Sequence, residues 1–597
     1  MRLSRLFVPA LFIASMPLNA SVPDPRFRKP AVPGFLQPME FRTVMMQTFP
    51  SEVSGMVPDR VSDLMWNPAT LAGLSKRTAY LDFFSAADNP VFAASAASAD
   101  PAVSARNWTD EFAAPRWYPQ TSVVPSESRP LVSLGLLLPV NRRLSLALFD
   151  RVTFDYGPFL QSMSGGGGWN AETADASYYD KARDVTLSRL ETGHNQQTTA
   201  GNRIEAVIGW RAADRLDLGL RLGHMVYHRN GELLEDDWAN YPHSSSAGLE
   251  DESLEIRGSQ IEAGLGAMFR PDCTFRVGVY GGLISGDGSE RSVALDTTAG
   301  WSEQDTDPRY FSRSASFLTA DQSYDADGVR PLVSANAEKR FSENWLMRAF
   351  VSYSWSETDV SGALASSDTT SGDRGYDYWQ SGSTFYRRTR SQGSRAGSLE
   401  GDGTEKTGTW KGFVSAVYAP RGCWSLFGGL HVQHQRFTRD FSENGRTQSH
   451  SMSVHTIYAP GSERSYYHHT RQYTTETEID RWSLALPVGL RIGAAKGFSA
   501  LIGASAAFML EDESVSGFRV YPVKTTRRWQ NGSLIVDDLE IDRAERFDSD
   551  PAKVLTRQLG RYFGLVYSHP AGVQAYLKFA DDFSQMSGWT IGFGMEW

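Results

Sequence analysis

The chain has 597 residues, of which 41% are hydrophobic and 21% charged, and its formal net charge is −10. The acidic balance gives no support to nucleic-acid binding. Two cysteines are too few for a disulfide scaffold or a cysteine-rich metal site. Beyond the N-terminus there is no run of 18 apolar residues, which excludes a helical membrane protein. An aromatic content of 12% and 53 glycines fit an all-β chain.

The first twenty residues have the layout of a signal peptide. Arg2 and Arg5 form a basic start, an apolar stretch follows from Leu6 to Met16, and Leu18-Asn19-Ala20 offers an imperfect cleavage site before Ser21. The alternative, a membrane anchor, is disfavoured because the apolar stretch is too short to span a bilayer. We therefore expect residues 1–20 to direct export from the cytoplasm.

Residues 21–77 form a second segment, which does not alternate between apolar and polar residues. The segment is rich in proline, with six between Pro23 and Pro50. Proline cannot donate to the hydrogen-bond ladder of a sheet, so this stretch is not part of a barrel wall. It is either a periplasmic tail or a plug inside a lumen.

From residue 78 onward, the dominant pattern is strict alternation over segments of about ten residues. Between residues 216 and 223, four leucines fall on one side of an extended chain and polar or glycine residues on the other. A period of two is the period of a strand. The pattern recurs near residues 132–138, 144–148, 204–210, 261–269, 345–355 and 482–492.

The spacing between these segments alternates between very short and long. Turns of about three residues, such as 140–142 and 212–214, are followed by polar stretches at 87–130, 155–201, 230–252, 286–328, 358–407, 439–473 and 512–555. Long structureless stretches count against a soluble sandwich, the competing all-β fold. The spacing predicts an all-β fold: a transmembrane antiparallel β-barrel of about 14–16 strands over residues 78–597, with long extracellular loops.

Aromatic residues near the strand ends support this prediction, because barrels carry aromatic girdles where they meet lipid headgroups. They include Trp210, Tyr227, Trp345, Trp355, Trp410, Trp424 and Trp482. The chain ends on an alternating strand whose apolar side carries Phe593, Met595 and the terminal Trp597. This end resembles the closing strand of bacterial outer-membrane barrels, which implies recognition by the barrel assembly machinery and a Gram-negative outer membrane.

A short motif precedes the first expected strand. Asp63, Trp66, Asn67, Pro68 and Ala69 lie in the stretch Ser-Asp-Leu-Met-Trp-Asn-Pro-Ala-Thr-Leu-Ala-Gly. It resembles the Asn-Pro-Ala segment of FadL-type outer-membrane proteins and of the related PorV-like secretion barrels. The resemblance implies an N-terminal hatch over residues 21–77 that blocks the lumen, with hydrophobic ligands passing it toward a lateral opening. An ordinary turn in a leader segment is the alternative reading.

Alternation also assigns charged residues to the lumen side of the expected barrel. These are Arg203, Glu205, Arg221, Glu262, Arg276, Arg348 and Arg491. Both signs are interleaved, which fits a polar channel, a charged network that anchors the hatch or an ordinary solvated interior.

Other groups carry weaker signals, and we expect no metal site, no cofactor and no enzymatic activity. His450, His455, His468 and His469 cluster in one expected loop but lack the spacing of metal ligands. Acidic runs at 235–237 and 511–513 read as solvated charge rather than cation sites. His434, with Asp440 following it, lies near an expected rim but has no identifiable nucleophile.

These features lead to one functional hypothesis and two alternatives. The first is an outer-membrane channel that transports small hydrophobic molecules, embedded in outer-membrane lipid and lipopolysaccharide and not binding nucleic acid. The alternatives are a PorV-like barrel that holds an exported protein and a structural or adhesive surface barrel. Cys273 and Cys423 begin strands that we count as four apart, so we expect two unpaired thiols at the periplasmic rim.

Overall fold

The computed structural model describes residues 63–64, 66–84, 132–157, 170–180, 185–241, 244–304, 310–380, 383–420, 424–456, 461–493, 497–548, 552–580 and 589–597. The expected signal peptide, most of the proline-rich segment and the stretch 87–130 lie outside these ranges. No helix within them is long and apolar enough to cross a bilayer.

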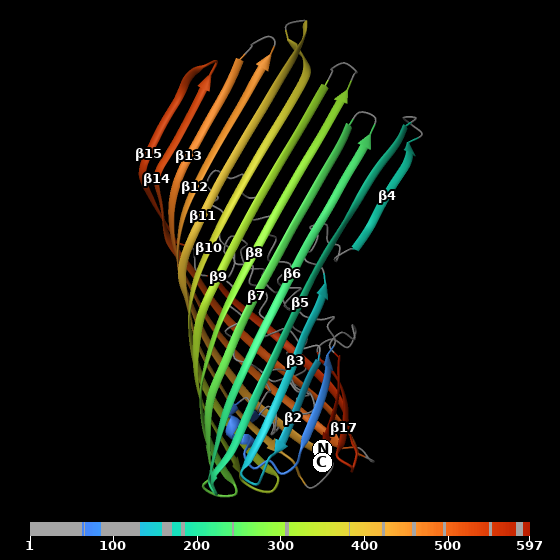
Figure 1. Ribbon diagram of the computed structural model, residues 1–597, viewed down its shortest axis with the longest axis vertical. Helices are drawn as coiled ribbons and strands as arrows, with labels where there is room; N and C mark the ends of the chain where they lie inside the picture. The colour runs from blue at the N-terminus through green and yellow to red at the C-terminus, as the bar shows by residue number, and fades with distance from the viewer. Residues whose placement is uncertain are drawn as a thin grey trace, which may run out of the picture.

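The described residues form one sheet of eighteen antiparallel strands (Figure 1). Ten strands are long: β5 (Val185–Ala213), β6 (Leu216–Tyr241), β7 (Ser244–Phe269), β8 (Phe275–Gln304), β9 (Tyr310–Arg340), β10 (Trp345–Gln380), β11 (Ser383–Tyr418), β12 (Trp424–Thr456), β13 (Gly461–Gly493) and β14 (Phe498–Gln530). The others are shorter: β1 (Thr78–Phe84), β2 (Val132–Pro139), β3 (Leu144–Gly157), β4 (Asn170–Asp180), β15 (Ser533–Asp548), β16 (Ala552–Ser568), β17 (Val573–Ala580) and β18 (Trp589–Glu596).

The sheet closes into a barrel through β1, which pairs with β2 on one side and with the last strand, β18, on the other. The ends of the wall are tied further by two hydrogen bonds between the backbones of Arg77 and Trp597. β3 and β4 follow one another along β5, and β15 and β16 follow one another along β14. Eighteen strands with two such collinear pairs leave sixteen positions around the wall, the upper end of the expected range. The transmembrane barrel fold is confirmed.

The lower part of the wall has the outer surface of a membrane barrel. On β10, Trp345, Val351 and Trp355 point outward and are 41–47% exposed, whereas the intervening Phe350 faces the lumen and is 8% exposed. The outward apolar run ends at Trp355, and Glu357 and Asp359 follow it. A run of about eleven residues is what a tilted strand needs to cross a bilayer. The alternation therefore records lipid outside and packed side chains inside.

We call this outward apolar surface of the lower wall the apolar belt. A row of ring-bearing side chains marks its outer edge. Tyr353, Trp410, His434 and Trp482 lie directly opposite one another on β10, β11, β12 and β13. Aromatic rings in one row across neighbouring strands form the girdle expected at a headgroup layer. Tyr227, expected in such a girdle, instead faces the lumen and packs against buried apolar residues. Its parity along β6 places it on the inner side.

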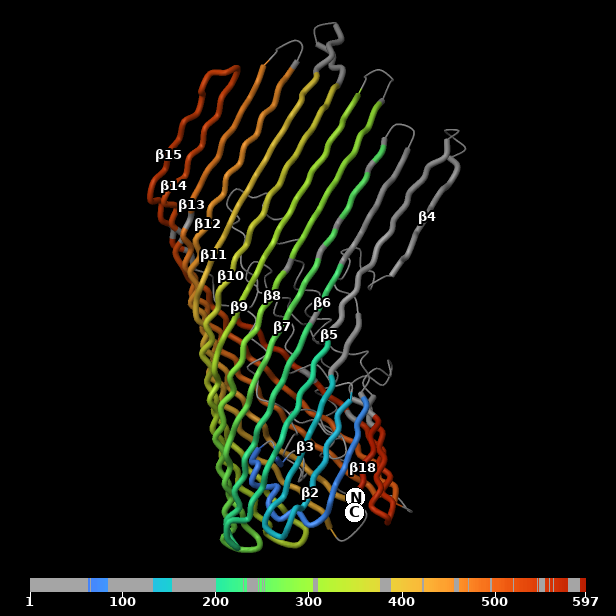
Figure 2. Tube along the Cα trace, in the orientation of Figure 1, coloured from blue at the N-terminus to red at the C-terminus, as the bar shows by residue number. Residues whose placement is uncertain are grey.

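Above the belt, one side of the wall continues as a tall curved sheet, seen from β8 to β15 in Figure 2 and extended by β4 to β7 in Figure 1. The polar stretches expected to be loops at 230–252, 286–328, 358–407, 439–473 and 512–555 are largely strand. The expectation of structureless loops was wrong there, because both faces of this sheet carry polar residues and the two-residue period disappears from the sequence. In the tall sheet, only two to five residues separate consecutive long strands at the top, as between β6 and β7 or β8 and β9.

Candidate functional site in the barrel lumen

A short turn of chain sits inside the base of the barrel. We call the described residues from 63 to 74 the inner segment; its centre is the 3-10 helix η3 (Pro68–Leu71). Asn67 caps this helix, because its side-chain oxygen accepts a hydrogen bond from the Ala69 amide at 3.0 Å. Pro68 occupies the first helical position, where a missing N–H costs nothing. The Asn-Pro-Ala motif therefore specifies the turn locally.

The same asparagine fastens the turn to the wall. Its Nδ2 donates to the carbonyl oxygens of Ala267 on β7, at 2.9 Å, and Val279 on β8, at 3.1 Å. Asn67 has no exposed surface. A buried amide that finds two acceptors on neighbouring strands fixes both the depth and the orientation of the turn.

Glycines in the wall make room for the inner segment. A Cβ on Gly219 of β6 would lie 2.3 Å from the Ala69 nitrogen, which no real structure tolerates. Equivalent clashes with residues 67–72 would arise at three more lumen-facing glycines: Gly209, Gly266 and Gly278. We call these four the glycine cradle. It spans β5 to β8 and allows the backbone of the turn to lie directly on the wall.

Charged side chains hold the start of the inner segment. Asp63 Oδ1 accepts a hydrogen bond from Arg348 Nη2 at 2.5 Å, and Asp63 Oδ2 lies 3.8 Å from Arg276 Nη2. Glu338 Oε2 lies 3.0 Å from Arg348 Nε and 2.6 Å from Arg276 Nη2. Asp63 is 6% exposed and Arg348 9%. Because a buried charge is costly without a partner, this four-residue network ties the segment to β8, β9 and β10.

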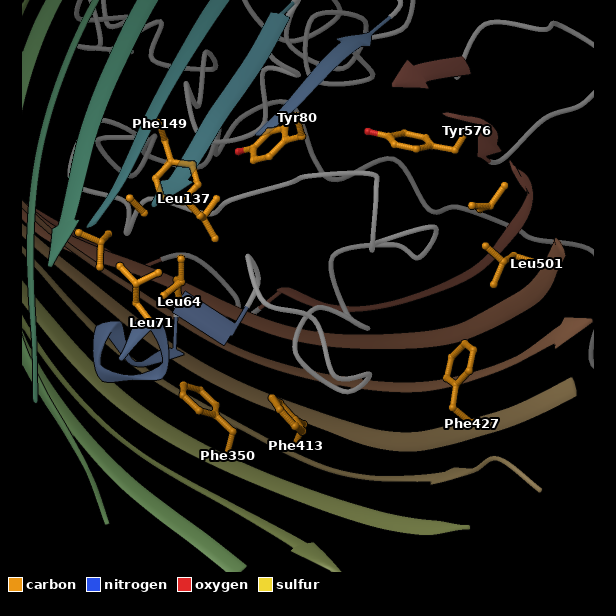
Figure 3. Packing of buried hydrophobic residues seen from close by; sticks show 13 residues of the cluster. Leu64, Leu71, Tyr80, Leu137, Phe149, Phe350, Phe413, Phe427, Leu501 and Tyr576 are labelled. Carbon is orange, nitrogen blue, oxygen red and sulfur yellow. The ribbon is translucent and has the colours of Figure 1, made fainter. Parts of the chain in front are cut away.

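Apolar side chains line part of the lumen around the inner segment. Trp66 packs edge-on against Phe350 and Phe413, with ring centroids 3.7 and 5.2 Å away. Figure 3 shows further side chains of the same cluster, which point inward from β1 to β3 and from the opposite side of the wall, β10 to β17. The members are Leu64, Leu71, Tyr80, Leu137, Ala147, Phe149, Val207, Phe350, Phe413, Phe427, Leu501, Val566 and Tyr576. We call this set the apolar ring.

A buried charged cluster lies on the side of the lumen formed by β5 to β8. Arg221 Nε is 2.6 Å from Glu205 Oε1 and 3.3 Å from Glu262 Oε1. Arg203 approaches the other oxygen of Glu205 at 3.7 Å, and the Tyr280 hydroxyl donates to Glu262 at 3.4 Å. Glu205, Glu262 and Arg221 are at most 2% exposed. This is a packed network rather than a solvated channel lining.

A second buried layer fills the inner face above the membrane belt. It contains Tyr324, Leu399 and Phe441, and beside them the carboxylate of Glu405, which is 1% exposed. Glu405 accepts a hydrogen bond from the Tyr324 hydroxyl and lies 3.5 Å from Arg439 Nε. Glu405 lies beyond Trp410 on β11, outside the apolar belt. Burial raises its pKa to about 7, although Arg439 acts in the opposite direction.

The structure places the remaining expected lumen residues as follows. Arg276 and Arg348 contact the inner segment, and Arg203, Glu205, Arg221 and Glu262 form the charged cluster. Arg491 shares its face with the buried Ala485 but is exposed near the lower end of β13. On β18, Phe593 and Met595, followed by the terminal Trp597, are 46–50% exposed and point outward. The glycine cradle was not predicted from the sequence. The signal that could have indicated it is one glycine at a lumen-facing position on each of four adjacent strands.

Three other groups considered in the sequence lie on strands of the sheet: the clustered histidines, the acidic run at 511–513 and His434. The clustered histidines lie on β12 and β13 instead of in a loop, and no metal-binding group is present within the described ranges. Glu511, from the acidic run at 511–513, is a buried partner of Arg481 at 2.7 Å. His434 contacts Asp480 at 3.1 Å and stacks on Trp482, so its partner is not Asp440.

The described residues fold as a large, closed antiparallel β-barrel. No protein-family model matches the chain, and no curated protein matches it. Among solved structures, a FadL homologue of Pseudomonas aeruginosa is similar with 10% identity and a TM-score of 0.28, covering 95% of this chain and 98% of that one. A mutant ferric enterobactin receptor of the same organism, in complex with enterobactin, has 8% identity and a TM-score of 0.26, covering 88% and 82%. The siderophore receptor PirA from Acinetobacter baumannii has 6% identity and a TM-score of 0.23, covering 87% and 80%. Similarities this low do not decide a substrate.

Proposed function

We propose that the protein is an outer-membrane transporter that conducts small hydrophobic molecules past the inner segment, which acts as a hatch. The observation that carries this proposal is the apolar ring. A barrel that conducts polar solutes lines its lumen with polar groups, whereas this lumen holds Phe350, Phe413, Phe427 and other apolar side chains in one cluster with two leucines of the inner segment. Such a lining lowers the free energy of an apolar solute in the lumen relative to water.

The attachment of the inner segment fits a hatch that can be displaced. It is held by the hydrogen bonds of Asn67, by one ionic network and by side-chain and backbone packing on the wall, rather than by pairing into the sheet. We propose a route in which a ligand enters from the tall side, displaces or passes the hatch, and leaves laterally or into the periplasm.

Gly219→Val tests the hatch. The added side chain would collide with the backbone at Ala69, so the hatch should leave its cradle. We expect vesicles containing this variant to leak small polar solutes several-fold faster than those with the unaltered protein. Gly281→Val is the matched control on β8, because nothing lies within 4 Å of its Cβ position. Equal leakage from both variants would contradict a plug.

Phe427→Ser tests the apolar ring separately. Phe427 is 4% exposed and belongs to the ring, and its replacement adds a polar group. We expect several-fold slower entry of an apolar fluorescent dye into vesicles, with unchanged leakage of polar solutes. Unchanged dye entry would favour the alternatives of a secretion-partner or adhesive barrel. Mass spectrometry of molecules that co-purify with the unaltered barrel would then identify the natural ligand.

A further inference from the structure

The outer face of the tall sheet contains a groove that has no part in the channel. It has a volume of 1120 Å³ and crosses six strands, from β9 to β14. Its two walls are neighbouring rows of outward side chains, as the pairing register shows. One row holds Phe317, Thr369, Ser394, His450, Tyr466 and Arg527. The other holds Ala315, Ser371, Gln392, Met452, Arg464 and Trp529.

The position of the groove separates it from lipid. Thr369 lies about 14 residues beyond Trp355 along β10, which is roughly 45 Å of strand. Phe317 is nevertheless 41% exposed and Met452 38%. Aromatic and sulfur-containing side chains at this height cannot be explained by contact with the bilayer core. Exposed apolar surface of this kind, set among polar groups, is typical of a binding site.

The composition of the groove favours linked sugar rings. His450 and Tyr466 lie side by side in its centre, with ring centroids 4.8 Å apart, and Trp529 stands at one end. Flat rings accept the C–H faces of sugars, and the small polar residues between them can exchange hydrogen bonds with hydroxyl groups. Five strand intervals give a length of about 24 Å, enough for roughly five sugar rings.

Two arginines set the expected charge of the ligand. Arg527 is paired with Asp537 at 2.9 Å, whereas Arg464 is exposed in the groove and no ion pair joins it to another described residue. One uncompensated guanidinium suits an occasional carboxylate rather than a dense polyanion. Nucleic acid is disfavoured further because the whole chain carries a net charge of −10.

We propose that this groove binds a saccharide chain bearing occasional carboxylates. Lipopolysaccharide and free polymers outside the cell both present such linked rings, and the two probes below separate these sources. The inference rests on the outer-membrane placement of the barrel but not on transport through it. The same side chains would serve either source.

The test is isothermal titration of the full-length, detergent-purified barrel. Two probes separate the sources: a hexamer of galacturonic acid and the delipidated polysaccharide of a smooth lipopolysaccharide. We expect at least one to bind, and we expect Tyr466→Ala and Trp529→Ala each to weaken that binding tenfold or more. Arg464→Gln should weaken binding of the acidic hexamer, while the weaker binding expected for neutral maltohexaose stays unchanged.

Matched controls make the result decisive. Phe518→Ala removes a 53% exposed ring from the same face outside the groove, and Arg436→Gln removes an outward arginine near the membrane. Neither should change the affinity. Failure of both probes to bind, equal losses in the controls, or tighter binding of a thymidine 20-mer would overturn the proposal. Vesicle leakage should be unaffected by the groove variants, so failure here is distinguishable from failure of the channel.

Discussion

The wall at membrane height and the tall sheet above it are made of the same strands but face different surroundings. On β10, outward residues up to Trp355 are apolar, and beyond Glu357 the two faces become similarly polar for most of the strand up to Gln380. Below, lipid on one side and a packed lumen on the other impose a two-residue period. Above, water reaches much of both faces and the period fades. Alternation in a sequence therefore reports a difference in solvent across a sheet, and not the presence of a strand.

The largest loss of stability is expected from the buried charged cluster in the lower wall. Arg221→Leu leaves the buried Glu205 and Glu262 without their nearest arginine, so we expect a loss of about 3–5 kcal/mol in the free energy of unfolding. Guanidinium-induced unfolding of the barrel in lipid vesicles measures it. Adding Glu205→Gln and Glu262→Gln to the same variant should recover most of the loss. An unchanged stability in Arg221→Leu would mean that water solvates this cluster.

A pair of leucines compares the two regions directly. Leu222, on the lipid-facing side of β6, is 49% exposed, and Leu539, on β15 in the tall sheet, is 59% exposed. An arginine facing the middle of the bilayer costs about 2–4 kcal/mol, whereas an exposed change in water stays within about 0.5 kcal/mol. Leu222→Arg should therefore impair folding into vesicles and Leu539→Arg should not. Similar losses in both variants would place the membrane boundary elsewhere.

The sequence predicts the lower wall and the turn at Asn67, but not the upper strands or the seat of the turn. The lower strands, the outward Trp355 and the inward Arg221 follow from alternation alone. The turn at Asn67 follows from local capping chemistry, but its seat on Gly219 and Gly266 depends on strands about 150 to 200 residues away. The upper strands were mistaken for loops because serine, glycine and acidic residues on both faces resemble loop composition.

The inner face of the tall sheet is expected to respond to pH. Glu405 has a pKa of about 7 in the folded protein because it is buried, against an ordinary value of 4.5. Between these values the folded state holds a proton that the unfolded state has released. The free energy of unfolding should therefore fall as pH rises from about 4.5 to about 7, by at most ~3 kcal/mol, and stay level above that.

Glu405→Gln should remove this slope in unfolding measured from pH 4 to 8. Glu400→Gln is the matched control, since Glu400 is on the same strand but exposed on the outer face. If the control flattens the curve as much as Glu405→Gln does, then the buried layer above the membrane is not what titrates.

The smallest effect on stability is expected from the cysteines at the lower rim. Their separation tests the strand order of both regions. Cys273 is exposed and unpaired just before β8, and Cys423 lies outside the described residues, immediately before β12. The sheet order separates these two strands by four positions, as expected. At ~4.8 Å per strand the two chain positions are roughly 19 Å apart, beyond the ~7 Å that a disulfide allows between Cα atoms.

Thiol titration of the unreduced, unfolded protein should therefore count two free cysteines. Cys273→Ser should change the free energy of unfolding by less than ~0.5 kcal/mol, because the side chain is exposed and spans no loop. A count of zero would require the starts of β8 and β12 to be neighbours. The register that places Arg221 between two carboxylates would survive that result, but the continuous sheet from β8 through β12, and with it the outer groove, would not.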